Sequence, residues 1–279
     1  MELTHADVLN MLPDRNPIAH KGDFGKILLL CGSRGYTGAA ALAAMGALRC
    51  GAGLVYLGVP ESIYEIEAIK LNEPVVIPLP DMNGMLSVQA LDRIMELLPN
   101  MDTVLIGCGM GCSDNTFSVV KRVLCEFSGP VVLDADGINV LAGHIDILRG
   151  RTGVTVLTPH EGEFQRIGGL LTEDRITSAK KFATDSKSIV LLKGHRTVIT
   201  DGEETYVNPT GNPGMAVGGS GDVLAGMISA LLGQGITPLE AAACGAWLHG
   251  AAGDICAEEI GQYGLLPTDM LGVLPRLLK

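Results

Sequence analysis

The sequence contains few aromatic and few charged residues. Of its 279 residues, 4% are aromatic and 18% are charged, whereas 47% are hydrophobic and the mean hydropathy is +0.32. This composition excludes an intrinsically disordered chain, which would be strongly charged and poor in apolar side chains. The length is sufficient for a large core, in one large α/β domain or two small ones.

Long uninterrupted apolar stretches are also missing. The longest ones are broken by Gly and Asp, so none fits a transmembrane helix, and residues 1–15 are polar and amphipathic, unlike a signal peptide. The seven cysteines are an odd number with no C-x-x-C pair, and most of them lie within apolar segments. We therefore expect reduced, buried thiols in a cytoplasmic protein that has no membrane span.

Two further absences narrow the possible partners. Acidic side chains outnumber basic ones, and the formal net charge is −11. This charge argues against non-specific nucleic-acid binding, because the phosphates would be repelled, but it is compatible with a local pocket for a small anion. Cys108 and Cys112 have a spacing that could suggest a metal, but no His or Cys pair completes a ligand set. A structural metal site is therefore disfavoured.

Glycine, by contrast, is abundant, with 37 residues that cluster between short apolar runs. Those runs predict buried strands at 26–31, 54–59, 74–79, 103–107, 130–135, 154–159 and 188–194, and an edge ribbon at 197–200 and 204–209 that turns at Asp201-Gly202. Helices are expected near 37–50, 61–71, 87–98, 114–127, 172–185, 220–233 and 237–259. The alternation predicts right-handed βαβ crossovers and a parallel sheet covered by helices on both faces. With no linker or repeat in the sequence, one domain over 1–279 is expected.

Several helix boundaries have recognisable signals. Residues 237–240 (TPLE) form the pattern of a capping box with Pro at the first helical position, and residues 158–161 (TPHE) have the same form. Gly51 and Gly53 are expected to end the helix that starts near Thr37.

The segments that follow the predicted strands are expected to carry the function, because ligands of open α/β sheets bind at the carboxyl ends of the strands. The loop GGSGD (218–222) opens a helix whose free amides favour a phosphate, but no Lys-Ser/Thr follows the last glycine, so it is not a Walker loop. Asp222 is then either a helix cap or a general base beside a phosphoryl group.

The other loops leave similar alternatives open. KGHRT (193–197) places Lys193, His195 and Arg196 where they either contact a nucleotide or form a solvated turn. In TPHEGE (158–163), His160 either orients a substrate or caps the turn. DADGIN (134–139) offers oxygen ligands for Mg²⁺ or an Asx turn, GCGMG (107–111) is a weak glycine motif, and the small-residue helix after GSRGYTG (32–38) leaves room for a bulky planar ligand.

Five of these segments together resemble the ADP-dependent NAD(P)H-hydrate dehydratases of the ribokinase-like superfamily. They are KGDFGKILLLCGSRGYTGAAALAAMGALRCGAGLV (21–55), VLDADGINVL (132–141), TPHEGEF (158–164), LLKGHRTVI (191–199) and GNPGMAVGGSGDVLAGMISALLGQG (211–235). The resemblance implies a three-layer αβα ribokinase-like fold. It also implies repair of the S-form of hydrated NADH or NADPH, with ADP consumed to AMP and phosphate.

The resemblance also implies roles for individual residues. Asp222 would be the catalytic base and would contact the hydrated dinucleotide together with Ala39, Gly109 and His160. The nucleotide would be held by Lys193, Gly194, His195, Arg196, Thr197, Gly219 and Gly221. Mg²⁺ is expected with nucleotide-phosphate chemistry, but its ligands are not identified.

The resemblance further implies a homotetramer without the fused epimerase domain of some bacterial members. The edge ribbon and a C-terminal helix at 266–278 could join the subunits. Two other functions remain open: a small-molecule kinase of the same superfamily, for example one acting on a vitamin precursor or a sugar, and a non-catalytic nucleotide-binding protein on the same fold.

Overall fold

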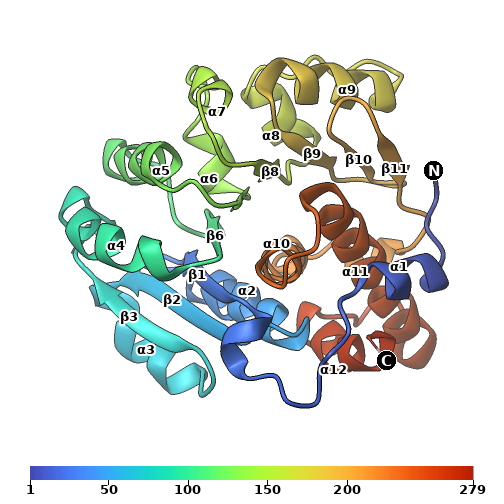
Figure 1. Ribbon diagram of the computed structural model, residues 1–279, viewed down its shortest axis with the longest axis horizontal. Coiled ribbons are helices and arrows are strands. Elements are labelled where there is room, and N and C mark those ends of the chain that lie inside the picture. The colour runs from blue at the N-terminus through green and yellow to red at the C-terminus, as the bar shows by residue number, and fades with distance from the viewer. Residues whose placement is uncertain (279) are drawn as a thin grey trace.

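The large sheet of the computed structural model, which describes residues 1–278, contains all nine strands that the apolar runs predict (Figure 1). They are β1 (Lys26–Leu30), β2 (Leu54–Pro60), β3 (Val75–Leu79), β6 (Thr103–Ile106), β7 (Val131–Leu133), β8 (Thr155–Leu157), β9 (Ile189–Leu192), β10 (Val198–Thr200) and β11 (Thr205–Val207). Their order is β11-β10-β9-β8-β7-β6-β1-β2-β3. All neighbours pair in parallel except β10, which is antiparallel to β9 and to β11. The edge ribbon is therefore confirmed, with its turn at Gly202 in a left-handed conformation.

Helices cover both faces of this sheet. The α-helices are α1 (His5–Met11), α2 (Thr37–Arg49), α3 (Tyr64–Lys70), α4 (Leu91–Leu97), α5 (Asp114–Glu126), α6 (Asp136–Asn139), α7 (Asp146–Arg149), α8 (Glu161–Arg166), α9 (Arg175–Ser186), α10 (Ser220–Gly233), α11 (Pro238–Ile260) and α12 (Pro267–Leu277). The 3₁₀ turns are η1 (Lys21–Phe24), η2 (Glu61–Ile63), η3 (Val88–Ala90), η4 (Leu98–Asn100) and η5 (Pro213–Met215).

The two faces of the sheet form two separate cores. Ile27 and Leu29 of β1 point into a cluster built with α2, α10, α11 and α12, whereas Leu28 and Leu30 point into a cluster built with α4, α5, α8 and α9. This alternation is the period of two that a strand imposes on its side chains. The three-layer αβα architecture predicted from the sequence is confirmed.

A small hairpin was not predicted. Strands β4 (Asp81–Met82) and β5 (Met85–Leu86) form a separate antiparallel pair joined by Asn83-Gly84, both with positive φ. This dipeptide is the preferred sequence of a type I′ turn, so the signal was present in the sequence. The short helices α1, α6 and α7 were also missed, because a helix of one or two turns has too little periodicity to detect, whereas the start of α8 was indicated by the TPHE pattern.

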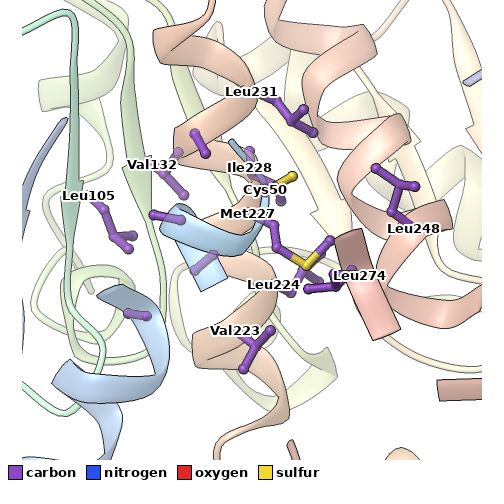
Figure 2. Close-up of a cluster of buried hydrophobic side chains, with 14 of the residues drawn as sticks. Cys50, Leu105, Val132, Val223, Leu224, Met227, Ile228, Leu231, Leu248 and Leu274 are labelled. Atoms are coloured by element: carbon purple, nitrogen blue, oxygen red, sulfur yellow. The ribbon is translucent and has the colours of Figure 1, made fainter. Parts of the chain in front are cut away.

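Helix α10 is the central element of the first core (Figure 2). Its residues Val223, Leu224, Met227, Ile228 and Leu231 are buried, and the same cluster contains side chains from β6, β7, α11 and α12. Glycines let α10 approach α2 closely: a Cβ on Gly46 would lie 2.5 Å from the Val223 carbonyl oxygen, and a Cβ on Gly226 would overlap the Ala43 carbonyl. This packing fixes where α10 begins, at the carboxyl edge of the sheet.

No helix within residues 1–278 has both the length and the hydropathy that a transmembrane span needs.

The close approach of α10 and α2 predicts a large difference between two glycine-to-alanine substitutions. Gly226→Ala should lower the free energy of unfolding by about 3 kcal/mol, because the new methyl group overlaps backbone that cannot move without separating the helices. Gly272→Ala, in α12, is the matched control: nothing lies within 4 Å of its Cβ position, so it should raise stability by about 0.5–1 kcal/mol. Urea denaturation of both variants measures the difference, and equal effects would contradict this account of the packing.

Candidate active site

The predicted nucleotide residues surround one cavity of about 660 Å³. It lies where the β9–β10 turn, the loop 208–217, the start of α10 and the middle of α11 meet. Among its lining residues are Lys193, Gly194, His195, Arg196, Thr197, Gly221 and His160. The structure therefore brings the KGHRT turn and the glycine loop together, although Thr197 and Gly218 are 21 positions apart along the chain.

The remaining predicted residues lie beside this cavity and not on its wall. Gly109 and Ala39 are neighbours, since a Cβ on Gly109 would lie 2.8 Å from the Ala39 Cβ. Gly219 is the N-cap residue of α10 and has a left-handed φ of 97°. Asp222 follows the cavity-lining Gly221 and approaches Cys108, the neighbour of Gly109 in the chain. Asp222 is thus adjacent both to a residue of the cavity wall and to the segment that holds Gly109.

Asp222 is not a helix cap. The N-cap position of α10 belongs to Gly219, and Asp222 sits in the first helical turn, where its side chain caps no backbone amide. Burial and then the nearby Asp134 raise the pKa of the Asp222 carboxyl to about 6. The capping interpretation is therefore wrong. The raised pKa also means that the groups around Asp222 stabilise its negative charge less well than water would.

Lys193 forms a buried ion pair at the centre of the site. Its Nζ lies 2.8 Å from Asp134 Oδ1 and 3.8 Å from Glu163 Oε2, and Asp134 is 2% exposed. Burial alone would lower the pKa of Lys193, but Asp134 and Glu163 outweigh it and raise the pKa. The ammonium is therefore charged on the wall of the cavity, and KGHRT is not simply a solvated turn.

His160 both caps α8 and lines the cavity. Its Nδ1 accepts hydrogen bonds from the amides of Gly162 (3.0 Å) and Glu163 (3.3 Å), while Glu163 accepts one from the His160 amide (2.9 Å). Because Nδ1 is an acceptor, the ring proton of the neutral imidazole is on Nε2. Capping the turn and orienting a substrate are therefore compatible functions for His160, since its side chain is more than half exposed and faces the cavity.

The two predicted capping boxes need correction. The cap of α8 is His160 and not Thr158, whose hydroxyl instead donates to Asp134 Oδ1 (2.7 Å). At α11 the N-cap residue is Thr237, but its hydroxyl donates to the Glu240 carboxylate and accepts no backbone amide. At α8 the Thr158 hydroxyl donates to the Asp134 carboxylate because a hydrogen bond to a charged acceptor is stronger than one between neutral groups.

The DADGIN segment stabilises the loops around it. Asp136 accepts from the amide of Gly111 (2.8 Å) and faces Cys112 Sγ and Asn139 Nδ2, each at 3.3 Å. These contacts favour the turn interpretation of Asp136 over a metal ligand. Asp134, by contrast, is directed to Lys193 and Thr158.

The donor atoms of the site do not fit a protein-held Mg²⁺. One Cys108 sulfur and carboxylate oxygens of Asp134 and Asp222 lie within 4.8 Å of one another. Mg²⁺ prefers an octahedron of oxygen ligands, whereas here one donor is a thiol and Asp134 is already neutralised by Lys193. A metal ion would therefore come with the nucleotide, held by its phosphate oxygens.

Three further residues support the cavity and were not predicted from the sequence. Asp254 of α11 accepts from the amide of Gly211 (2.8 Å) and from Asn212 Nδ2 (2.9 Å), which fixes the loop in front of α10. His249 is buried on the wall 3.4 Å from the Ser220 hydroxyl, and burial lowers its pKa to about 4. Arg175 of α9 donates to backbone carbonyls of residues 192, 193 and 195 and so shapes the KGHRT turn. Nothing in an apolar or surface-helix pattern distinguishes these three positions.

The arrangement defines the class of protein first. An αβα sandwich with an antiparallel edge ribbon, a glycine loop before a buried helix and a carboxylate in the first turn of that helix is the arrangement of a ribokinase-like fold. The fold agrees with a ribokinase-like superfamily protein from Enterococcus faecalis, with a TM-score of 0.86 and 27% identity over 99% of this chain and 94% of that one.

Within this class, the chain belongs to the NAD(P)H-hydrate dehydratase (Carb_kinase) family, whose model matches residues 27–276. An ADP/ATP-dependent NAD(P)H-hydrate dehydratase from Bacillus subtilis, co-crystallised with ATP/Mg²⁺, superposes with a TM-score of 0.85 and 32% identity, covering 98% of this chain and 96% of that one. The bifunctional NAD(P)H-hydrate repair enzyme Nnr of Moorella thermoacetica is 46% identical over 99% of this chain and 53% of its own length. The chain thus spans about half the length of the curated relatives that it matches.

The raised pKa of Asp222 predicts that its charge destabilises the fold. The folded state binds this proton more tightly than the unfolded chain, so stability falls as pH rises from about 4 to about 6. Asp222→Asn should therefore raise the Tm at pH 8 by roughly 2–6 °C, and the gain should shrink as the pH falls below 6.

Asp114→Asn is the matched control, because Asp114 is an exposed carboxylate in the first turn of α5. It loses only a favourable interaction with the helix dipole and should not raise the Tm. Calorimetry of both variants between pH 4 and pH 8 makes the comparison, and an Asp222→Asn protein less stable than the parent at pH 8 would show that the carboxylate is well compensated.

Proposed function

We propose that this chain catalyses the nucleotide-dependent dehydration of the S-form of hydrated NADH or NADPH and so regenerates the reduced dinucleotide. The observation that carries the proposal is the position of Asp222. Its carboxylate has a raised pKa, follows the cavity-lining Gly221 in the chain and lies within 4.8 Å of the thiol of Cys108, the neighbour of Gly109.

The proposed reaction has two stages. Asp222 accepts the proton of the ring hydroxyl, whose oxygen attacks the terminal phosphoryl group of the nucleotide, so that a P–O bond forms to the ring and the bond to AMP breaks when ADP is used. The ring nitrogen lone pair then expels the phosphate, and loss of a ring proton restores the dihydropyridine. Phosphorylation is needed because hydroxide is a poor leaving group.

We assign the nucleotide to the cavity and the dinucleotide ring to its Asp222 side. Lys193, Gly194, His195, Arg196 and Thr197 would hold the nucleotide. The amides at Gly219 and Gly221 would stabilise charge on the transferring phosphoryl group, aided by the positive end of the α10 dipole. Ala39, Gly109 and His160 would position the hydrated ring against Asp222. ADP is the proposed co-substrate, with ATP as an alternative, and Mg²⁺ would enter as part of the nucleotide complex.

A small-molecule kinase is the second candidate, since it would use the same cavity and the same carboxylate. It would release a stable phosphorylated alcohol and would not restore the absorbance of reduced nicotinamide. Incubating the protein with acid-hydrated NADH and either ADP or ATP separates the two functions. Recovery of the absorbance without nucleotide, or nucleotide turnover without recovery, would contradict the proposal.

Asp222→Asn should abolish most of this activity. We expect kcat to fall on the order of 10²–10⁴-fold, because the amide cannot accept the hydroxyl proton, while ADP affinity stays within a few-fold of the parent. Spectrophotometric assays and calorimetric titration with ADP measure the two effects. Asp136→Asn is a carboxylate control near the site that faces the Gly111 amide, and it should keep a kcat within about tenfold of the parent.

The same pKa sets the pH dependence. The base must be ionised, so kcat/KM should fall below about pH 6 with a slope of one proton. A profile measured from pH 5 to pH 9 with freshly prepared substrate tests this, and an unchanged rate at pH 5 would exclude Asp222 as the base.

A further inference from the structure

Cys108 is buried between the two carboxylates at the centre of the site. Its side chain is 0% exposed, its Sγ lies 3.7 Å from Asp134 Oδ2, and the sulfur and one oxygen of each carboxylate all lie within 4.8 Å of one another. Lys193 forms its ion pair with Asp134. Its positive charge also lowers the pKa of Asp222, but by less than burial and Asp134 raise it.

The thiol is a neutral donor at this position. Contact with Cys31, burial and the charges of Asp222 and Asp134 all raise the pKa of the Cys108 thiol well above its usual range. The sulfur therefore keeps its proton, and an S–H group can donate a hydrogen bond to a carboxylate oxygen. A donor of this kind favours the ionised form of Asp222, in opposition to burial and to Asp134.

The backbone around Cys108 fixes the direction of the thiol. Cys108 follows β6, its carbonyl accepts from the Gly32 amide (2.8 Å), and its neighbours Gly107 and Gly109 both have positive φ. Gly109 in turn contacts Ala39. The residue therefore connects the proposed ring side of the site to the first turn of α10.

The geometry points to Cys108 as a positioning residue for the reaction: its thiol donates to Asp134 Oδ2, lies within 4.8 Å of the Asp222 carboxylate, and so reduces the negative charge that Asp222 faces. This inference rests on the proposed function of Asp222. The other charged groups that face Asp222 are Asp134 and Asp136, from the segment after β7, and Lys193, after β9. Substitutions at Cys108 leave all three in place.

Three variants test the role. Cys108→Ala removes the donor and should move the acid limb of kcat/KM upward by about 0.5–1 pH unit, whereas Cys108→Ser keeps a donor and should leave the limb within about 0.2 unit of the parent. Cys31→Ala is the matched control, because Cys31 is an equally buried thiol that follows β1, contacts Cys108 and lies outside the group of Cys108, Asp134 and Asp222. It should lower the Tm without moving the limb.

The outcomes separate this inference from the proposed function. An inactive parent, or an active Asp222→Asn protein, would overturn the proposed function itself. If the parent is active and Asp222→Asn is inactive, two results would overturn the role of Cys108. One is an acid limb of kcat/KM that does not move in Cys108→Ala, and the other is an equal shift of that limb in Cys31→Ala. If Cys108→Ala does not fold, Cys108→Val fills the same space without a donor, and its acid limb is compared with that of Cys108→Ser.

Discussion

The buried ion pair between Lys193 and Asp134 is the interaction on which the site depends. It joins the segments after β7 and β9, and it brings a fixed positive charge to the start of α10. Removing either partner would leave an uncompensated buried charge, which is far more costly than replacing both. Burial and the nearby Asp134 raise the pKa of Asp222 to about 6, and Lys193, which is shared with Asp134 and Glu163, offsets this rise only in part. The pair thereby orders the site and also leaves one carboxylate basic enough to accept a proton.

Helix packing determines where that carboxylate stands. Gly46 and Gly226 allow α2 and α10 to approach until backbone meets backbone, so neither helix can slide without losing the contact. Gly219 turns the chain in a left-handed conformation just before α10, so Gly221 lines the cavity and Asp222 is placed beside it. The glycines of this region therefore have separate roles: Gly46 and Gly226 allow the helix contact, Gly219 allows the turn, and Gly221 lines the cavity.

The sequence predicted the nine strands, a parallel sheet with an edge ribbon and the loops that line the cavity, because these features follow from local patterns and from the rule that ligands bind at strand ends. It did not predict the order of the strands. It could not predict side-chain partners. The pattern TPHE indicated Thr158 as a cap, but Asp134, 24 residues away, takes that hydroxyl and His160 becomes the cap. Asp254, His249 and Arg175 were missed for the same reason, since each acts on a loop distant in the chain. Cys108 appeared only as part of a glycine motif and a disfavoured metal spacing.

On the proposed function, the division of the site into two halves explains how a kinase-like site can carry out a net elimination. Activating an alcohol toward a terminal phosphate needs the amides of α10, Lys193 and a base, and all of these lie on the cavity side or at its border. What happens to the phosphate ester is decided by the substrate, because a nitrogen lone pair next to the ester carbon expels phosphate without help from a further protein acid. Ala39 and Gly109 would then act through shape and not through chemistry, since they pack closely together and a Cβ on Gly109 would lie 2.8 Å from the Ala39 Cβ. A kinase and this dehydratase would thus differ mainly in the half of the site that receives the alcohol.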